Sequence, residues 1–320
     1  MPHSLVNGWM TDGRMLVTVD SQAQAFLDIV AGAPPLDTQS AEQNRADLVQ
    51  ALPLTGTPTA VQSVEDLTLP GSGGPIRVRL YRPRVGDVLP VVAYFHGGGW
   101  VLGSPDVADT TTRDIAVFGD VVVVSVDYRL APEHPFPAAV EDALAVTRAL
   151  LAGQLPGVDP SRVAVAGDSA GGNLAAVVAQ QLRDQTGLRH QVLIYPVTQA
   201  RVGQTESYRQ FRDGHFLTAR DMQYFFDCYA AGVDPDDPRL SPLAAADLSG
   251  LAAATVITAE CDPLRDEGEQ YAAALRAAGV DVATRRYDGQ VHPFVYMSGL
   301  IDDAVRAREF IGSQLRQALH

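Results

Sequence analysis

The sequence contains no lysine, so all 24 of its basic residues are arginine. This absence excludes the phosphate-binding lysine of the P-loop, the Ser-x-x-Lys nucleophile pair and the Schiff-base lysine of pyridoxal enzymes. Cysteine is also scarce, because Cys228 and Cys261 are the only two and have neither CxxC spacing nor a neighbouring histidine pair. We therefore expect two buried free thiols rather than a zinc site or a redox dithiol.

Long apolar runs and positive net charge are missing as well. No run reaches membrane-spanning length, and residues 1–20 lack the apolar stretch of a signal peptide, so we expect a cytoplasmic protein without a stable membrane anchor. The net charge of −14 disfavours nucleic acids and anionic membranes as partners. At 46% apolar residues over 320 positions, the chain can bury a large core.

What the sequence does contain is a series of short apolar runs that alternate with helical patterns. The runs expected to form a buried parallel sheet are residues 90–95, 121–126, 162–166, 191–195 and 254–259, with a late strand at 281–287. The expected helices are 110–118, 138–151, 173–182, 265–278 and 300–319. This alternation predicts an α/β fold with a mostly parallel central sheet and helices on both faces.

The parts outside this alternation have their own patterns. Residues 64–69 and 76–80 flank a glycine-rich turn, and the second run alternates apolar with arginine residues, which predicts antiparallel edge strands. An aromatic-rich stretch without strand runs separates two core strands. We therefore predict an N-terminal helical cap segment (1–55), a first core part (56–197), a cap insertion (198–240) and a second core part (241–320).

The most informative stretch is G-D-S-A-G at residues 167–171, which lies between an expected strand and an expected helix. A sharp strand-to-helix turn strains the backbone at the serine, and the flanking glycines avoid a clash there. In isolation the pattern is also that of an ordinary Gly/Ser turn. Its position in the chain predicts that Ser169 is a nucleophile.

A nucleophilic serine needs a histidine base, and the histidine needs an acid to orient it. His292 follows the last expected strand, which fits the chain order serine, acid, histidine. Asp262 stands just after an expected strand, at the sheet edge where catalytic groups gather, and Pro263 ends that strand. Glu260 is the alternative acid.

The tetrahedral intermediate of acyl transfer needs hydrogen-bond donors for its oxyanion. A glycine run at residues 97–99 follows the first core strand and offers unhindered backbone N–H groups. We expect N–H groups of this run and the N–H of Ala170 to form the oxyanion hole. We expect Trp100, Phe216 and Leu217 to contact the substrate.

Taken together, the motifs resemble those of the bacterial hormone-sensitive-lipase-like (family IV) carboxylesterases. The matching segments are H-G-G-G-W at 96–100, D-Y-R-L-A-P-E at 127–133, G-D-S-A-G-G at 167–172, S-P-L at 241–243 and D-P-L-R-D-E-G at 262–268. The resemblance covers residues 60–320. It implies an α/β-hydrolase fold with a helical cap, and hydrolysis of short- to medium-chain acyl esters.

The resemblance also supports Ser169, Asp262 and His292 as a catalytic triad, with residues 128–133 as structural support. It implies Gly97, Gly98 and Ala170 as the oxyanion donors. We expect no need for a metal or an organic cofactor. The chain departs from the family at Pro293, where the family usually has glycine, and we expect a slightly altered histidine loop there.

Three functional hypotheses follow. The first is a serine carboxylic ester hydrolase that acts through an acyl-enzyme. The second is an amidase or thioesterase with the same triad. An anionic substrate would favour a basic rim, which could be formed by Arg201, Arg209, Arg212 and Arg220. A solvated helix face explains these four arginines as well. The third, a non-catalytic ligand receptor, is disfavoured because all three triad positions are filled. A homodimer is compatible with the sequence, which carries no readable interface.

Overall fold

The computed structural model describes residues 17–86 and 88–320 of the chain. Within these residues one 8-stranded sheet has the strand order β1-β2-β4-β3-β5-β6-β7-β8. The strands are β1 (Ser63–Leu69), β2 (Ile76–Arg82), β3 (Leu89–Phe95), β4 (Val122–Asp127), β5 (Val158–Asp168), β6 (Leu188–Ile194), β7 (Ala253–Cys261) and β8 (Val282–Val291). β1 and β2 are antiparallel to their neighbours, and all other pairs are parallel. The predicted α/β architecture with antiparallel edge strands is confirmed.

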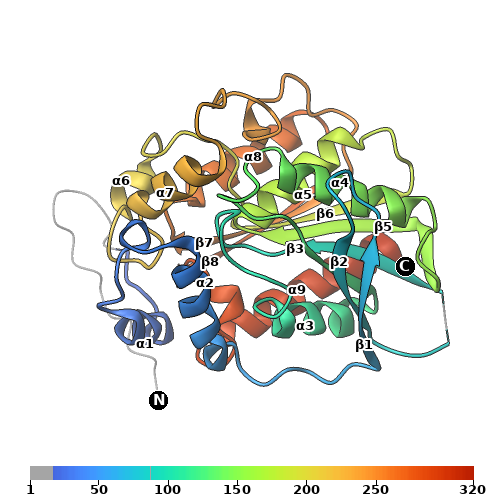
Figure 1. Ribbon diagram of the computed structural model, residues 1–320, viewed down its shortest axis with the longest axis horizontal. Helices are drawn as coiled ribbons and strands as arrows, with labels where there is room; N and C mark the ends of the chain where they lie inside the picture. The colour runs from blue at the N-terminus through green and yellow to red at the C-terminus, as the bar shows by residue number, and fades with distance from the viewer. Residues whose placement is uncertain (1–16, 87) are drawn as a thin grey trace, which may run out of the picture.

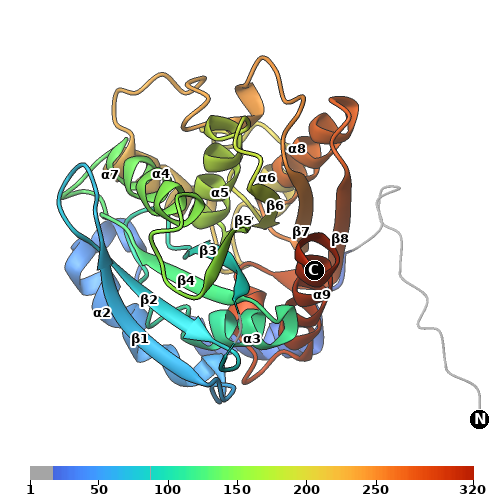
Figure 2. The same cartoon turned by 90° about the vertical axis from the view of Figure 1, so that its right-hand side faces the viewer.

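Helices cover both faces of this sheet (Figure 2). One face carries α4 (Ala138–Leu151), α5 (Ala170–Gln181) and α8 (Arg265–Ala277), and the other carries α3 (Asp109–Gly119) and α9 (Asp302–Leu319). β3 is buried along its whole length, as expected for a central strand with helices on both sides. On α9 the buried residues recur every three or four positions, at Ala304, Ala307, Ile311, Leu315 and Leu319, so one stripe of the helix faces the sheet.

The remaining helices gather at one end of the molecule. α1 (Ser21–Val30), η1 (Leu36–Thr38), α2 (Ala41–Gln50) and η2 (Leu52–Thr55) precede the sheet, and α6 (Glu206–Gln210) and α7 (Ala219–Tyr229) lie in the segment between β6 and β7. Figure 1 shows α1 and α2 beside α6 and α7, although they are far apart in sequence. Residues 1–16 of the predicted cap segment lie outside the described residues.

The contacts between these two groups of helices are specific. The Phe26 and Phe216 rings lie 5.2 Å apart, and Arg220 forms an ion pair with Asp37 at 2.9 Å. The N-terminal segment therefore packs on the insertion as well as on the core. Among the described helices, none combines the length and the hydrophobicity needed to cross a lipid bilayer.

Candidate active site

Ser169 occupies the sharp turn between β5 and α5. Its backbone has φ 55° and ψ −118°, which is a strained conformation for a residue with a side chain. The turn is tightly packed, since a Cβ atom on Gly171 would lie 1.9 Å from the carbonyl oxygen of Phe95. A Cβ atom on Gly167 would lie 2.2 Å from the carbonyl oxygen of Gly171. Both clashes are with backbone atoms, so only glycine fits at position 167, two residues before the serine, and at position 171, two residues after it.

The order of the strands explains how distant residues meet at this turn. β5, β6, β7 and β8 are consecutive, parallel neighbours, so their carboxyl ends lie side by side at one edge of the sheet. Ser169, Tyr195, Asp262 and His292 each come directly after one of these four strands. The topology therefore brings the predicted nucleophile, acid and base to the same edge.

The structure joins Asp262 directly to His292. Asp262 Oδ2 lies 2.8 Å from His292 Nδ1, and Asp262 Oδ1 accepts a hydrogen bond from the Leu264 N–H at 2.8 Å. A carboxylate only accepts hydrogen bonds, so Nδ1 carries the proton and Nε2 presents a lone pair. The Asp262 side chain has no exposed surface and that of His292 is 6% exposed. This pair can orient a histidine as a general base.

Two further observations bear on this pair. Within the described residues, no hydrogen bond joins Ser169 Oγ to His292, whose ring packs against Tyr195 with centroids 4.4 Å apart. The alternative acid, Glu260, accepts a hydrogen bond from the Gly289 N–H at 2.7 Å, and the described residues show no hydrogen bond between Glu260 and His292. The His292–Pro293 peptide bond is cis.

In the glycine loop, the N–H group of Gly97 already has an acceptor within the protein. The Gly97 N–H donates to Asp168 Oδ1 at 3.0 Å, so a substrate oxygen would have to compete for it. The N–H groups of Gly98 and Gly99 have no acceptor among the described residues. Ala170 is the first residue of α5, so its N–H has no intrahelical acceptor either. The available donors are thus Gly98, Gly99 and Ala170.

Tyr128 holds the residue that precedes the glycine loop. The Tyr128 hydroxyl donates to the carbonyl oxygen of His96 at 2.7 Å, and the two rings stack with centroids 4.3 Å apart. Burial lowers the pKa of His96 to about 4, so its ring is neutral at pH 7. This contact lies in the 128–133 segment that the sequence suggested as support for the site.

The three residues predicted to contact the substrate lie in different surroundings. Trp100 has no exposed surface and stacks on Tyr229 of α7 with ring centroids 4.6 Å apart. Leu217 is buried. Phe216 has a φ of +74° and is 40% exposed, so it lies at the rim of the helical end of the molecule.

Sequence reasoning missed the role of Asp168. This carboxylate is 1% exposed and accepts hydrogen bonds at Oδ1 from the hydroxyls of Tyr94 (2.8 Å) and Tyr296 (2.6 Å), in addition to the Gly97 N–H. Burial raises its pKa to about 6. The available signal was a charged residue just after the short apolar run of residues 163–166.

The acidic residues that follow Asp262 hold the insertion. Asp266 accepts a hydrogen bond from the Ser207 N–H at 2.7 Å, and Glu267 accepts one from the Thr198 N–H at 2.7 Å. Burial raises the pKa of Glu267 to about 8. Both cysteines are free, and Cys261 is buried as expected while Cys228 is only half-buried.

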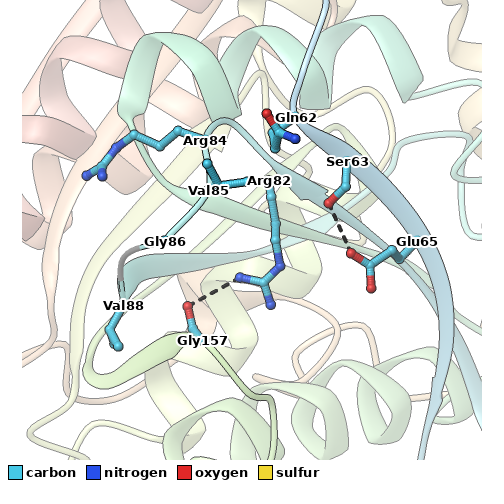
Figure 3. A pocket seen from close by; sticks show the side chains of 9 residues that line it. All are labelled: Gln62, Ser63, Glu65, Arg82, Arg84, Val85, Gly86, Val88 and Gly157. Atoms are coloured by element: carbon cyan, nitrogen blue, oxygen red, sulfur yellow. Dashed lines mark hydrogen bonds between the residues drawn. The ribbon is translucent and has the colours of Figure 1, made fainter.

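A surface hollow of ≈ 450 Å³ lies at the opposite edge of the sheet (Figure 3). Gly157, in the wall of the hollow, lies just before β5, whereas Ser169 lies just after it. The hollow and Ser169 are therefore at opposite ends of this strand. Arg82 in the hollow donates to the carbonyl oxygens of Pro156 and Gly157. This hollow is not part of the catalytic edge.

Comparison with known proteins supports the same family. Residues 92–296 match the family model described as the alpha/beta hydrolase fold. The chain is 47% identical over 266 residues to the carboxylic ester hydrolase LipN of Mycobacterium tuberculosis, covering 80% of this chain and 70% of that protein. It is 38% identical over 297 residues to an ethyl acetate hydrolase of Pseudomonas putida, covering 89% and 92%.

Solved structures agree with the sequence comparison. The esterase of the hyperthermophilic archaeon Pyrobaculum calidifontis matches with a TM-score of 0.88 and 41% identity, covering 94% of this chain and 98% of that one. A thermostable esterase of Pseudomonas putida matches with a TM-score of 0.90 and 40% identity, covering 95% and 98%. The resemblance seen in the motifs is thereby confirmed: the chain belongs to the α/β-hydrolase family, in the branch of the hormone-sensitive-lipase-like carboxylesterases.

Proposed function

We propose that the protein hydrolyses carboxylic esters with short- to medium-chain acyl groups through an acyl-enzyme on Ser169. The observation that carries this proposal is the buried 2.8 Å contact between Asp262 and His292 at the strand edge that also bears Ser169. The names of its relatives, which include a carboxylic ester hydrolase and an ethyl acetate hydrolase, support the ester bond as the target.

In the proposed reaction, His292 Nε2 takes the Ser169 hydroxyl proton as Oγ attacks the ester carbonyl. The resulting oxyanion accepts hydrogen bonds from the N–H groups of Gly98, Gly99 and Ala170, which have no acceptor in the described part of the chain. His292 then gives its proton to the departing alcohol. Water repeats the sequence on the acyl-enzyme and releases the acid, while Asp262 holds the imidazolium that forms in each half.

The helical end of the molecule is proposed to act as a cap over this edge. Contacts between α1 and the insertion, and the stacking of Trp100 on Tyr229, support a cap formed from residues 1–55 and 198–240. A cytoplasmic location and a homodimer stay predictions from the sequence.

A thioesterase acting on an anionic substrate is less well supported. Each of the four arginines that could form a basic rim already pairs with a carboxylate. The pairs are Arg201–Asp236, Arg209–Glu206, Arg212–Asp213 and Arg220–Asp37. Their charges are thus neutralised locally.

The test is hydrolysis of p-nitrophenyl esters from acetate to palmitate by the wild-type protein and by S169A. We expect activity that is highest on short chains, and a loss of about 10⁴-fold or more in S169A with an unchanged thermal unfolding midpoint. Anilide and thioester analogues of the preferred ester test the alternatives. A wild-type protein that is folded but inactive on every ester would contradict the proposal.

A further inference from the structure

Arg45, on α2 of the N-terminal helical segment, reaches the backbone next to the glycine loop. Its Nε donates to the carbonyl oxygen of Val101 at 2.8 Å, and its Nη2 donates to the carbonyl oxygen of Ala131 at 2.8 Å. The same guanidinium forms a bidentate ion pair with Glu133, with contacts of 2.8 and 2.7 Å. The Arg45 side chain is 28% exposed, so its charge lies at the boundary between the helical end and the core. One side chain thus joins α2 to two backbone segments of the core.

A turn in the glycine loop controls the direction of the Gly99 N–H. The carbonyl oxygen of Gly98 accepts hydrogen bonds from the Val101 N–H at 3.1 Å and from the Leu102 N–H at 2.8 Å. This carbonyl and the Gly99 N–H belong to one planar trans peptide group, so the N–H points away from the turn. The Gly99 N–H has no acceptor among the described residues and is one of the proposed oxyanion donors. The turn that holds the Gly98 oxygen therefore sets the direction of this donor.

A series of hydrogen bonds joins Arg45 to this donor. The Leu102 N–H that binds the Gly98 oxygen shares a peptide group with the Val101 carbonyl, which accepts from Arg45. The series therefore runs from the guanidinium through two peptide groups and ends at the Gly99 N–H. Hydrogen-bonded groups in such a series polarise one another, so a positive charge at the first donor strengthens the last one. In the proposed reaction, the last donor faces the oxyanion.

The second hydrogen bond to the Gly98 oxygen depends on the same guanidinium. Its donor, the Val101 N–H, shares a peptide group with the Trp100 carbonyl, which accepts from the Ala131 N–H at 2.9 Å. Ala131 is in turn held by Arg45 through its own carbonyl oxygen. Loss of the guanidinium would therefore loosen both peptide groups that fix the Gly98 carbonyl.

We propose that Arg45 is a positioning residue for the reaction, which orients and polarises the Gly99 N–H toward the oxyanion through the peptide groups of the glycine-loop turn. This inference rests on the proposed esterase function. Arg45 acts on the loop and not on the substrate, so its effect is on the transition state, where the oxyanion forms. Docking of α2 on the core then completes the oxyanion hole in addition to covering the site.

The experiment compares R45M with the wild type on the preferred p-nitrophenyl ester. Methionine keeps an unbranched apolar side chain but removes the charge and every donor. We expect kcat to fall about 5- to 30-fold with KM within about threefold. This loss is smaller than the 10²- to 10³-fold that removal of an oxyanion donor typically costs, because the donor is weakened and not removed.

A trifluoromethyl ketone gives a second measurement, because its serine-bound form places an oxyanion in the hole. Its inhibition constant should rise in R45M by the factor by which kcat/KM falls. An unchanged kcat, a change confined to KM, or an unchanged inhibition constant would overturn the inference. A wild-type protein without esterase activity would instead overturn the proposed function.

Two variants separate this effect from the attachment of the helical end. E133Q removes the charge of the ion-pair partner and leaves both carbonyl oxygens to Arg45, so its kcat should fall several-fold less than that of R45M. R220Q removes an exposed arginine pair within the helical end and should leave kcat and the inhibition constant unchanged. Equal losses in R45M and E133Q would assign the effect to the ion pair and contradict the inference.

R45K is the conservative variant. It keeps the charge but lacks the planar fork that reaches two carbonyl oxygens and a carboxylate at once. We expect its kcat to lie between those of R45M and the wild type. If R45M does not fold, R45K decides the question. A loss of kcat larger than that of E133Q, with a parallel rise in the inhibition constant, supports the inference, and a loss no larger than that of E133Q contradicts it.

Discussion

Different kinds of interaction stabilise the catalytic edge and the helical end of the molecule. At the catalytic edge, Asp168 and Asp262 are almost fully buried and use short hydrogen bonds to groups on rigid strands and tight loops. At the helical end, the ion pairs are exposed, as in Arg220–Asp37, where the side chains are 56% and 37% exposed. Exposed pairs contribute about 0–1 kcal/mol each, so packing rather than charge attaches this end. The comparison teaches that the side chains with the most closely fixed positions are those that bind the buried charged groups.

The largest expected effect comes from breaking the buried catalytic pair. D262N should lower kcat about 10³- to 10⁴-fold, because an amide cannot stabilise the imidazolium and favours the wrong tautomer. Steady-state kinetics on the preferred ester measure it. The control is E260Q on the same strand, which should change kcat less than about threefold. Equal losses in the two variants would mean that Asp262 has no special role.

The next effect concerns a buried ion pair beneath the histidine loop. Arg308 is 1% exposed, pairs with Asp114 at 2.9 Å and donates twice to the carbonyl oxygen of Val295. R308M should lower the free energy of unfolding by about 3–5 kcal/mol, since it leaves Asp114 as an uncompensated buried charge.

Arg306 on the same helix provides the exposed comparison. It pairs with Asp303 at 2.8 Å while 62% exposed, and R306M should cost less than about 1 kcal/mol. Urea unfolding of both variants measures the difference. If R308M and R306M lower the free energy of unfolding by similar amounts, the proposed difference between buried and exposed ion pairs is wrong.

A third effect links Asp168 to the pH dependence of stability. Its pKa is raised from 3.8 to about 6 in the folded protein, so the folded state binds its proton more tightly than the unfolded state. The stability it contributes is present at acid pH and is lost as pH rises through about 6. Relative to D168N, the wild type should therefore lose about 2 kcal/mol between pH 4 and pH 7. Urea unfolding at several pH values tests this, and a constant difference would contradict it.

The smallest effect is expected at the helical end. R220Q removes the exposed pair with Asp37 and should change the free energy of unfolding by less than about 1 kcal/mol. Thermal and urea unfolding are sufficient to measure it. A cost above about 2 kcal/mol would show that ion pairs, in addition to aromatic contacts, fasten this end to the core.

The sequence predicted the fold because buried parallel strands and their helices have distinct residue patterns. It also predicted that Ser169, Asp262 and His292 would lie together, since the carboxyl ends of neighbouring parallel strands share one edge. The direction of the Gly97 N–H was not predictable, because the residue types of a glycine loop do not determine which way each peptide group faces. The burial of Trp100 depends on Tyr229, which lies on a helix distant in the chain.

The position of β7 and β8 in the chain has a consequence during protein synthesis. His292 meets Asp262 only after these two strands, the last of the sheet, have paired. The ribosome delivers the chain from its N-terminus, so the nascent polypeptide carries the proposed nucleophile well before the proposed acid and base. We therefore expect the site to be complete only when the C-terminal strands have been released and have docked.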